Sequence, residues 1–152
     1  MKKAFSLLMA LMLLLSVCVF AQAEEETQPV VYVTIANGEL ALCQEPVTVT
    51  DADGDGALTI ADALYLAHEA AFDGGAEAGF AAETTEYGLT LTRLWGVENG
   101  GSYGYYVNNT AAMSLADPVA DGDFINAFVY TDLTAWSDGY CVFDAETVAP
   151  GE

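Results

Sequence analysis

Basic side chains are almost absent from this 152-residue chain, which has 3 lysines and arginines against 23 aspartates and glutamates. Lys2 and Lys3 lie at the extreme N-terminus, and all 23 acidic residues follow residue 23. Arg93 is therefore the only lysine or arginine in the sequence beyond residue 23. The chain beyond residue 23 therefore has a formal net charge of −22. Such a charge repels nucleic acids and anionic membrane surfaces and attracts divalent cations. We expect no nucleic-acid partner.

Histidine is also scarce, since it occurs only as His68. It lies in a predicted helix among aromatic residues, where a packed histidine is commoner than a catalyst or a metal ligand. It has no clear serine or cysteine partner, and no lysine follows Lys3. The side chains for nucleophilic or acid–base catalysis are therefore few, and we expect no enzymatic activity. For Arg93 we expect an ion pair with a nearby carboxylate.

The N-terminus has the pattern of an export signal. Two lysines precede an apolar run over 5–20, and Ala21-Gln22-Ala23 supplies small residues for cleavage. We expect a signal peptide at 1–23, a polar leader at 24–28 and one domain over 29–149 in a secreted or cell-surface protein. The alternative is an uncleaved anchor, but the apolar run is short for a membrane span. Membrane contact is then expected only through the signal segment before cleavage.

Cysteine occurs three times, and two cysteines, Cys43 and Cys141, lie beyond the predicted signal. An even number of cysteines in an exported chain favours a disulfide between them. In the chain-entropy model, closing so long a loop stabilises by up to ~4–5 kcal/mol. Two buried free thiols are the alternative. The distance between the cysteines and the lack of histidines argue against a zinc site.

The segment 51–62, DADGDGALTIAD, has the spacing of a twelve-residue calcium loop. Calcium takes several hard oxygen ligands, and acids stand here at loop positions 1, 3, 5 and 12. Gly56 at position 6 permits the sharp turn that the loop requires. We predict a Ca²⁺ site from the side chains or carbonyls of Asp51, Asp53, Asp55, Ala57, Thr59 and Asp62. The alternative is an Asp/Gly-rich turn without metal.

Two features separate this loop from a helix–loop–helix calcium site. Position 12 is aspartate where glutamate is usual, and the residues before the loop, 47–50, have the β-branched content of a strand. A calcium loop that ends in aspartate and has no entering helix resembles one half of a dockerin repeat.

The rest of the chain predicts an α+β fold. The spacing of five apolar residues predicts a helix over 59–72 with one buried face: Leu58, Ala61, Leu64, Ala67 and Ala71. Asn37-Gly38 predicts a hairpin turn. A second helical or irregular piece is expected at 76–82. The expected strands are 30–35, 39–43, 47–50, 87–95, 103–108, 124–130 and 139–143. This order favours a single sheet with one helix packed across it and the calcium loop inserted before the helix.

Three short stretches, Trp95-Gly96, 105–109 (YYVNN) and 121–124 (DGDF) before a strand, resemble the DUF4430 family over roughly residues 30–143. That family is similar to the C-terminal domain of transcobalamin and to β-grasp proteins that bind soluble ligands. The resemblance implies a β-grasp-like mixed sheet and a ligand of corrinoid type. In the vitamin-binding relatives, the β-grasp domain covers a corrinoid that a separate helical domain holds.

Aromatic side chains supply the candidate ligand site, which we predict at Trp95, Tyr103, Tyr105 and Trp136, with Tyr106 beside them. Such residues line pockets for glycans and other flat ligands, although strand aromatics also fill cores. Two functions follow. The chain is either a calcium-binding module for a soluble ligand or a calcium-stabilised adhesion module that contacts another surface protein through the loop and helix. The adhesion function predicts an exposed apolar patch around Tyr65 and Phe72.

Overall fold

A computed structural model describes residues 27–98, 100, 102–135 and 137–139. Its main element is a mixed sheet of five strands in the order β2-β1-β7-β5-β6. β1 (Val30–Ala36) and β2 (Leu40–Thr48) form the hairpin that Asn37-Gly38 predicts. β7 (Phe124–Val129) lies parallel to β1, and antiparallel pairing adds β5 (Tyr103–Val107) and β6 (Thr110–Ala111) beyond it.

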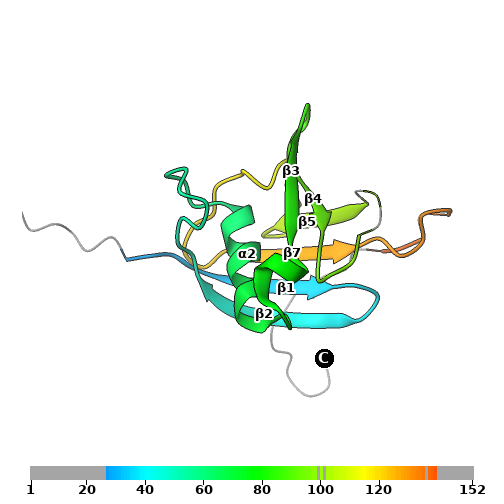
Figure 1. The fold of residues 1–152 in the computed structure, drawn as a ribbon, viewed down its shortest axis with the longest axis horizontal. Helices are drawn as coiled ribbons and strands as arrows, with labels where there is room; N and C mark the ends of the chain where they lie inside the picture. Colours follow the sequence, from blue (N-terminus) through cyan, green and yellow to red (C-terminus); the bar gives the residue numbers. More distant parts are fainter. Residues whose placement is uncertain (1–26, 99, 101, 136, 140–152) are drawn as a thin grey trace, which may run out of the picture.

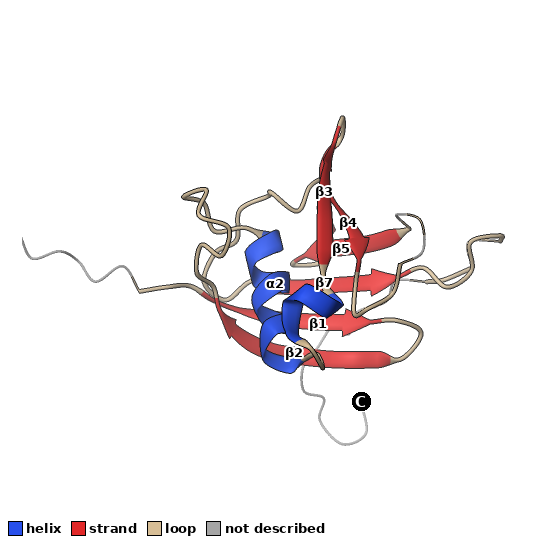
Figure 2. Cartoon of the chain, viewed as in Figure 1, coloured by secondary structure: helices blue, strands red, loops and turns tan. Residues whose placement is uncertain are grey.

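The helix α2 (Ile60–Ala71) crosses one face of this sheet (Figures 1 and 2). Its buried side chains include Ile60, Ala63, Leu64 and Ala67, which recur at helical spacing. Ala71, predicted on the buried face, is exposed at the last turn of the helix. A short second helix, α3 (Gly75–Gly79), follows it. The hairpin, the crossing helix and the central parallel pair make the α+β, β-grasp-like fold that the sequence predicts.

Alternation along the central strands separates the two faces of the sheet. Val31, Val33 and Ile35 of β1 are fully buried on the face below α2, as are Ile125 and Ala127 of β7. The residues between them point to the other face. There the rings of Tyr32 and Phe124 stack with their centroids 5.0 Å apart, and those of Tyr106 and Phe128 are 6.0 Å apart.

The sequence predicts one sheet, and the structure contains a second. β3 (Ala81–Thr85) and β4 (Gly88–Arg93) form a separate two-stranded hairpin, which projects away from the main sheet in Figure 1. Leu89 joins it to the segment before β7, because its carbonyl accepts a hydrogen bond from the Leu115 amide at 2.8 Å. β3 replaces part of the piece expected at 76–82, which is therefore helical only as far as Gly79.

The sequence predicts separate strands at 39–43 and 47–50, with Glu45-Pro46 in the gap between them. This gap is also wrong, because β2 runs through it. β2 is the outermost strand of the sheet, where proline does not interrupt a hydrogen-bonded ladder. The irregularity lies one residue earlier, at Gln44, whose φ of 48° accompanies a shift in the register with β1.

The expected strands at 87–95, 103–108 and 124–130 are confirmed within one or two residues as β4, β5 and β7. The expected strand at 139–143 extends beyond Gly139, outside the described residues. Among the residues that the structure describes, no helix combines the length and apolar character needed to cross a membrane.

Candidate metal centre

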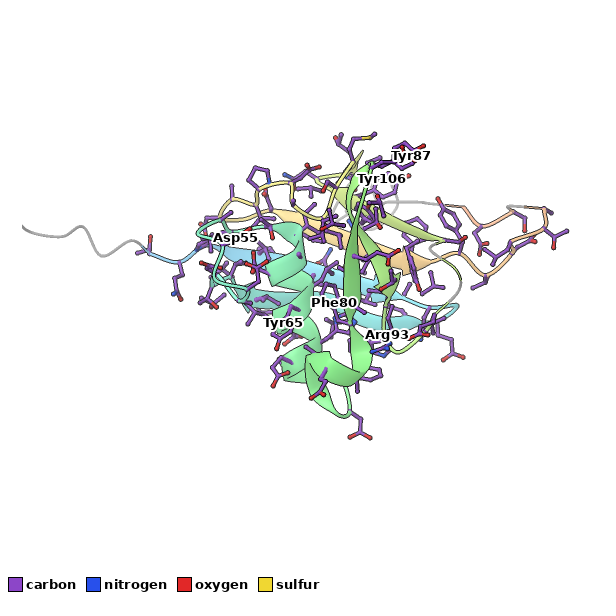
Figure 3. All side chains as sticks on the ribbon, turned by 45° about the horizontal axis from the view of Figure 1, so that its top comes forward. Asp55, Tyr65, Phe80, Tyr87, Arg93 and Tyr106 are labelled. Carbon is purple, nitrogen blue, oxygen red and sulfur yellow. The ribbon has the colours of Figure 1, made fainter. Side chains whose placement is uncertain are left out.

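Asp51, Asp53 and Asp55 converge at one end of the molecule, in the loop between β2 and α2. Each offers a carboxylate oxygen, and these oxygens all lie within 4.8 Å of one another. All three residues are exposed, and Figure 3 shows Asp55 on this loop above the start of the helix. The structure therefore brings together the acids at loop positions 1, 3 and 5.

The backbone of the loop explains this convergence. The Asp51 carboxylate accepts hydrogen bonds from the amides of Gly54 at 2.7 Å, Asp55 at 3.1 Å and Gly56 at 2.9 Å. The chain can wrap around one side chain in this way because Gly54 and Gly56 have φ values of 80° and 88°. The other two acids cap the following turn, since Asp53 accepts from the Asp55 amide and Asp55 from the Ala57 amide.

These hydrogen bonds also affect the ionisation of Asp51. The Gly56 amide makes the largest contribution to lowering the pKa of Asp51, and the Gly54 and Asp55 amides lower it further. Asp51 thus remains ionised to a lower pH than a free aspartate, because the charged form accepts these bonds. Three exposed carboxylates with hard oxygen atoms can hold a metal ion.

Asp62, the predicted ligand at position 12, lies buried at the start of α2. Its Oδ2 accepts hydrogen bonds from the Thr59 amide at 2.9 Å and the Thr59 hydroxyl at 2.7 Å, and its Oδ1 accepts from the Ala52 amide at 2.9 Å. Thr59 in turn caps the helix, so the pair forms a capping box. The Thr-x-x-Asp spacing carries this signal in the sequence.

Asp62 consequently links the loop to the helix without joining the three-acid cluster. Thr59 is buried with it, and Ala57 is exposed beside the cluster. Participation of Ala57, Thr59 and Asp62 in metal binding stays a prediction.

The predicted aromatic site is dispersed over several elements. Trp95 contacts two rings from α2 and its end, with centroid distances of 5.2 Å to His68 and 5.1 Å to Phe72. The Tyr103 hydroxyl lies within hydrogen-bond distance of the carbonyls of Thr92 at 2.7 Å and Val97 at 2.9 Å, which brings this strand beside the turn that carries Trp95.

Tyr105 lies on the same face of β5 as Tyr103 and is half-buried against the core. Its pKa is raised, because burial and, to a smaller extent, the charge of Asp117 disfavour the ionised form. Tyr106 lies on the opposite face with Phe128. Trp136 lies outside the described residues.

His68 is fully buried, and its ring packs against those of Phe72, Phe80 and Trp95. Its Nδ1 lies 2.6 Å from the Leu64 carbonyl, and its Nε2 accepts a hydrogen bond from the Trp95 amide at 3.0 Å. The two bonds together select the neutral tautomer with a proton on Nδ1. Desolvation lowers the pKa of His68, against a smaller opposing effect of the Leu64 carbonyl. The expectation of a packed histidine is confirmed.

Arg93 pairs with Glu98 through its Nη2 at 2.6 Å and also donates to the Glu77 carbonyl, as an ion-pairing role predicts. Cys43 is exposed on β2 and forms no disulfide with any residue that the structure describes. Its predicted partner, Cys141, lies outside the described residues, so the disulfide stays a prediction.

A scan against models of known protein families finds no match for this chain, and a search of curated proteins finds none.

Proposed function

We propose that this chain is an exported calcium-binding module whose metal ion stabilises the loop at the start of α2, and that the folded module binds a soluble ligand. The observation that carries the proposal is the convergence of Asp51, Asp53 and Asp55. The export pattern of residues 1–23 and the net charge of −22 beyond it agree with a calcium-rich environment outside the cytoplasm.

Calcium is the best candidate among common cations for this loop. The donors are carboxylate oxygens, which favour Ca²⁺ or Mg²⁺ over softer metals. The acids alternate with glycine and alanine in an exposed loop, which suits the flexible six- to eight-ligand shell of Ca²⁺ better than the strict octahedron of Mg²⁺. Ala57, Thr59 and Asp62 stand at the remaining ligand positions of the calcium-loop pattern.

Calcium would act mainly on stability. Asp51, Asp53 and Asp55 repel one another when ionised, and a divalent cation removes that repulsion. Binding to the folded form alone contributes RT ln(1 + [Ca]/Kd), about 2.7 kcal/mol at a hundredfold excess over Kd. The hydrogen bond from the Ala52 amide to Asp62 connects the loop to the first turn of α2, so an ordered loop would also stabilise the start of the helix.

Soluble-ligand binding rests on the β-grasp-like fold, on the resemblance to ligand-binding β-grasp domains, and on the aromatic residues Trp95, Tyr103 and Tyr105. Corrinoids and glycans are the ligand classes to test first. A screen on the calcium-loaded chain, read by tryptophan fluorescence and thermal shift, tests this part. If no member of either class binds, or if Trp95→Phe leaves every binding response unchanged, the aromatic site is not the binding site.

A second candidate is an adhesion module that contacts another surface protein through the loop and α2. Tyr65 favours it, because this residue is 39% exposed on α2 and meets Phe80 edge-to-face at 6.2 Å. Figure 3 shows both residues on the helix side of the molecule. Phe72 does not extend this patch, because it packs against Trp95 and His68. Loss of partner binding in Tyr65→Ser, with an unchanged melting temperature, would support this candidate.

Thermal melting with calcium and with a chelator tests the metal. We expect calcium to raise the melting temperature of the wild type and to have little effect on Asp53→Asn. Asp53 is the suitable position because Asp51 also accepts three backbone hydrogen bonds. Glu83→Gln on β3 removes the same charge outside the loop and should keep the full calcium response. A calcium response that Asp53→Asn retains would place the metal elsewhere.

A further inference from the structure

A hollow of about 410 Å³ lies at the end of the sheet where β1 turns into β2 and where the chain leaves β7. Thr34 and Ala36 of β1 and Phe128 of β7 line its wall. Glu39 and Leu40 of the hairpin and Asp138 of the segment after β7 also line it. Its volume falls within the range of small-molecule sites.

The hollow is built by a well-defined turn. Asp138 accepts hydrogen bonds from the Thr131 hydroxyl at 2.6 Å and from the amides of Thr131 at 3.1 Å and Asp132 at 2.7 Å. The chain therefore reverses after β7 and returns beside the sheet. On the other side, a Cβ at Gly38 would lie 3.6 Å from Thr131 Cγ2, so the hairpin turn packs against the same segment.

Apolar surface and negative charge meet in this hollow. Leu40 is 62% exposed, and Ala36 and Phe128 add further apolar surface. Glu39 and Asp138 are the charged residues in the lining, and none of its residues is basic. The Glu39 side chain forms no hydrogen bond or ion pair with the part of the chain that the structure describes. One acceptor site on the Asp138 carboxylate also remains after its three bonds, since an ionised carboxylate offers about four.

We propose that this hollow binds a small organic cation with an apolar or aromatic body, which places its ammonium group between Glu39 and Asp138 and its body against Leu40, Ala36 and Phe128. The Thr131 hydroxyl makes the largest contribution to lowering the pKa of Asp138, which keeps this carboxylate charged in weak acid. The hollow includes neither the calcium loop nor Trp95, so this proposal goes beyond the proposed function and can fail independently of it.

Three indole compounds of similar shape test the charge requirement: tryptamine as the cation, tryptophol as the neutral form and indole-3-acetate as the anion. Each compound is titrated, at physiological salt, into the ¹⁵N-labelled, calcium-loaded chain that comprises residues 24–152. We expect saturable amide shifts at Gly38, Leu40, Thr131 and Gly139 with tryptamine, and affinities at least about tenfold weaker for the other two compounds. The electrostatic attraction of two carboxylates for one cation supplies this preference.

Two variants and one control separate specific binding from general attraction to an acidic protein. Glu39→Gln should weaken tryptamine roughly threefold, in the range of an exposed charge pair. Ala36→Leu should abolish binding by filling the hollow, with an amide spectrum that verifies its folding. Glu83→Gln, which removes the same charge on β3, should leave tryptamine affinity unchanged. Asp53→Asn should also bind tryptamine normally, even if the calcium proposal fails.

Three results would overturn the proposal. Equal affinity for tryptophol and tryptamine would remove the role of charge. Shifts spread over the acidic surface, equally weakened by Glu83→Gln, would show non-specific attraction. Binding that appears only in a variant ending at Gly139 would show that residues beyond it, and no external cation, occupy the hollow.

Discussion

Replacing His68 by asparagine or by glutamine separates the two hydrogen bonds of its buried ring. Asparagine places an amide near the Nδ1 position and keeps a donor for the Leu64 carbonyl, but it leaves the Trp95 amide without its acceptor. Glutamine can reach the Nε2 position and keeps that acceptor. Leu64 lies inside α2, where its carbonyl also accepts from the helix, so losing the His68 donor costs less than leaving the Trp95 amide unpaired.

The difference between the two variants has a calculable size. A buried amide without a partner costs about 1–3 kcal/mol. Both variants lose the ring contacts with Phe72, Phe80 and Trp95, so this loss cancels between them. We therefore expect His68→Asn to be less stable than His68→Gln by about 1–3 kcal/mol in urea unfolding at pH 7.5.

The same histidine predicts a pH dependence. Its folded pKa lies below the unfolded value of about 6.5, so the unfolded chain takes up the proton more readily. This contribution to stability is complete above about pH 6.5 and falls below it, by up to about 1.4 kcal/mol per pH unit, until the folded pKa is reached. Urea unfolding at several pH values between 5.5 and 7.5 should show this slope in the wild type and in neither variant. Parallel profiles for all three proteins would refute the assignment of a buried neutral His68.

Three further changes test other parts of the fold. Thr59→Ala should lower the free energy of unfolding in urea by about 0.5–2 kcal/mol, because it removes the helix cap, whereas Thr59→Ser should keep most of the stability. Equal losses of stability in the two variants would contradict the capping box. Gly104→Ala should destabilise by about 1–3 kcal/mol in thermal melting, because the added Cβ would overlap the ring of Phe128. Gly139→Ala, where an added Cβ has nothing within 4 Å, is the neutral control, and similar melting of the two would disprove the close approach. Asp132 should titrate with a pKa of about 2 by carboxyl NMR, because the Ser137 hydroxyl and then the Ala135 and Thr134 amides donate hydrogen bonds to its charged form. The contribution of this carboxylate to stability is present above about pH 4 and is lost as the pH falls through about 2. An ordinary pKa near about 3.9 would rule out this turn.

Local signals in the sequence predict the elements that local physics controls. The apolar spacing of Leu64 and Ala67 defines α2, Asn37-Gly38 defines the first hairpin, and the acids of the loop converge because glycines at 54 and 56 let the backbone wrap around Asp51. These arrangements depend on residues within a few positions of one another.

Non-local choices could not be predicted in the same way. The attachment of the β3–β4 hairpin to the segment before β7 depends on non-local contacts such as the hydrogen bond between Leu89 and Leu115, which no local pattern encodes. Pro46 indicates a strand break until β2 is known to be an edge strand. Asp62 has the spacing of a calcium ligand and of a helix cap, and the structure uses its carboxylate for the cap. The hollow beside Glu39 joins residues from three separate segments, so no motif marks it.

Calorimetric titration of Ca²⁺ into the metal-free chain beyond residue 23 tests the central claim most directly. The convergence of Asp51, Asp53 and Asp55 predicts one saturable site per chain, which Asp53→Asn weakens strongly and Glu83→Gln leaves intact. A titration without saturable heat, or one that both variants change equally, would contradict the claim and leave the loop as an acidic turn.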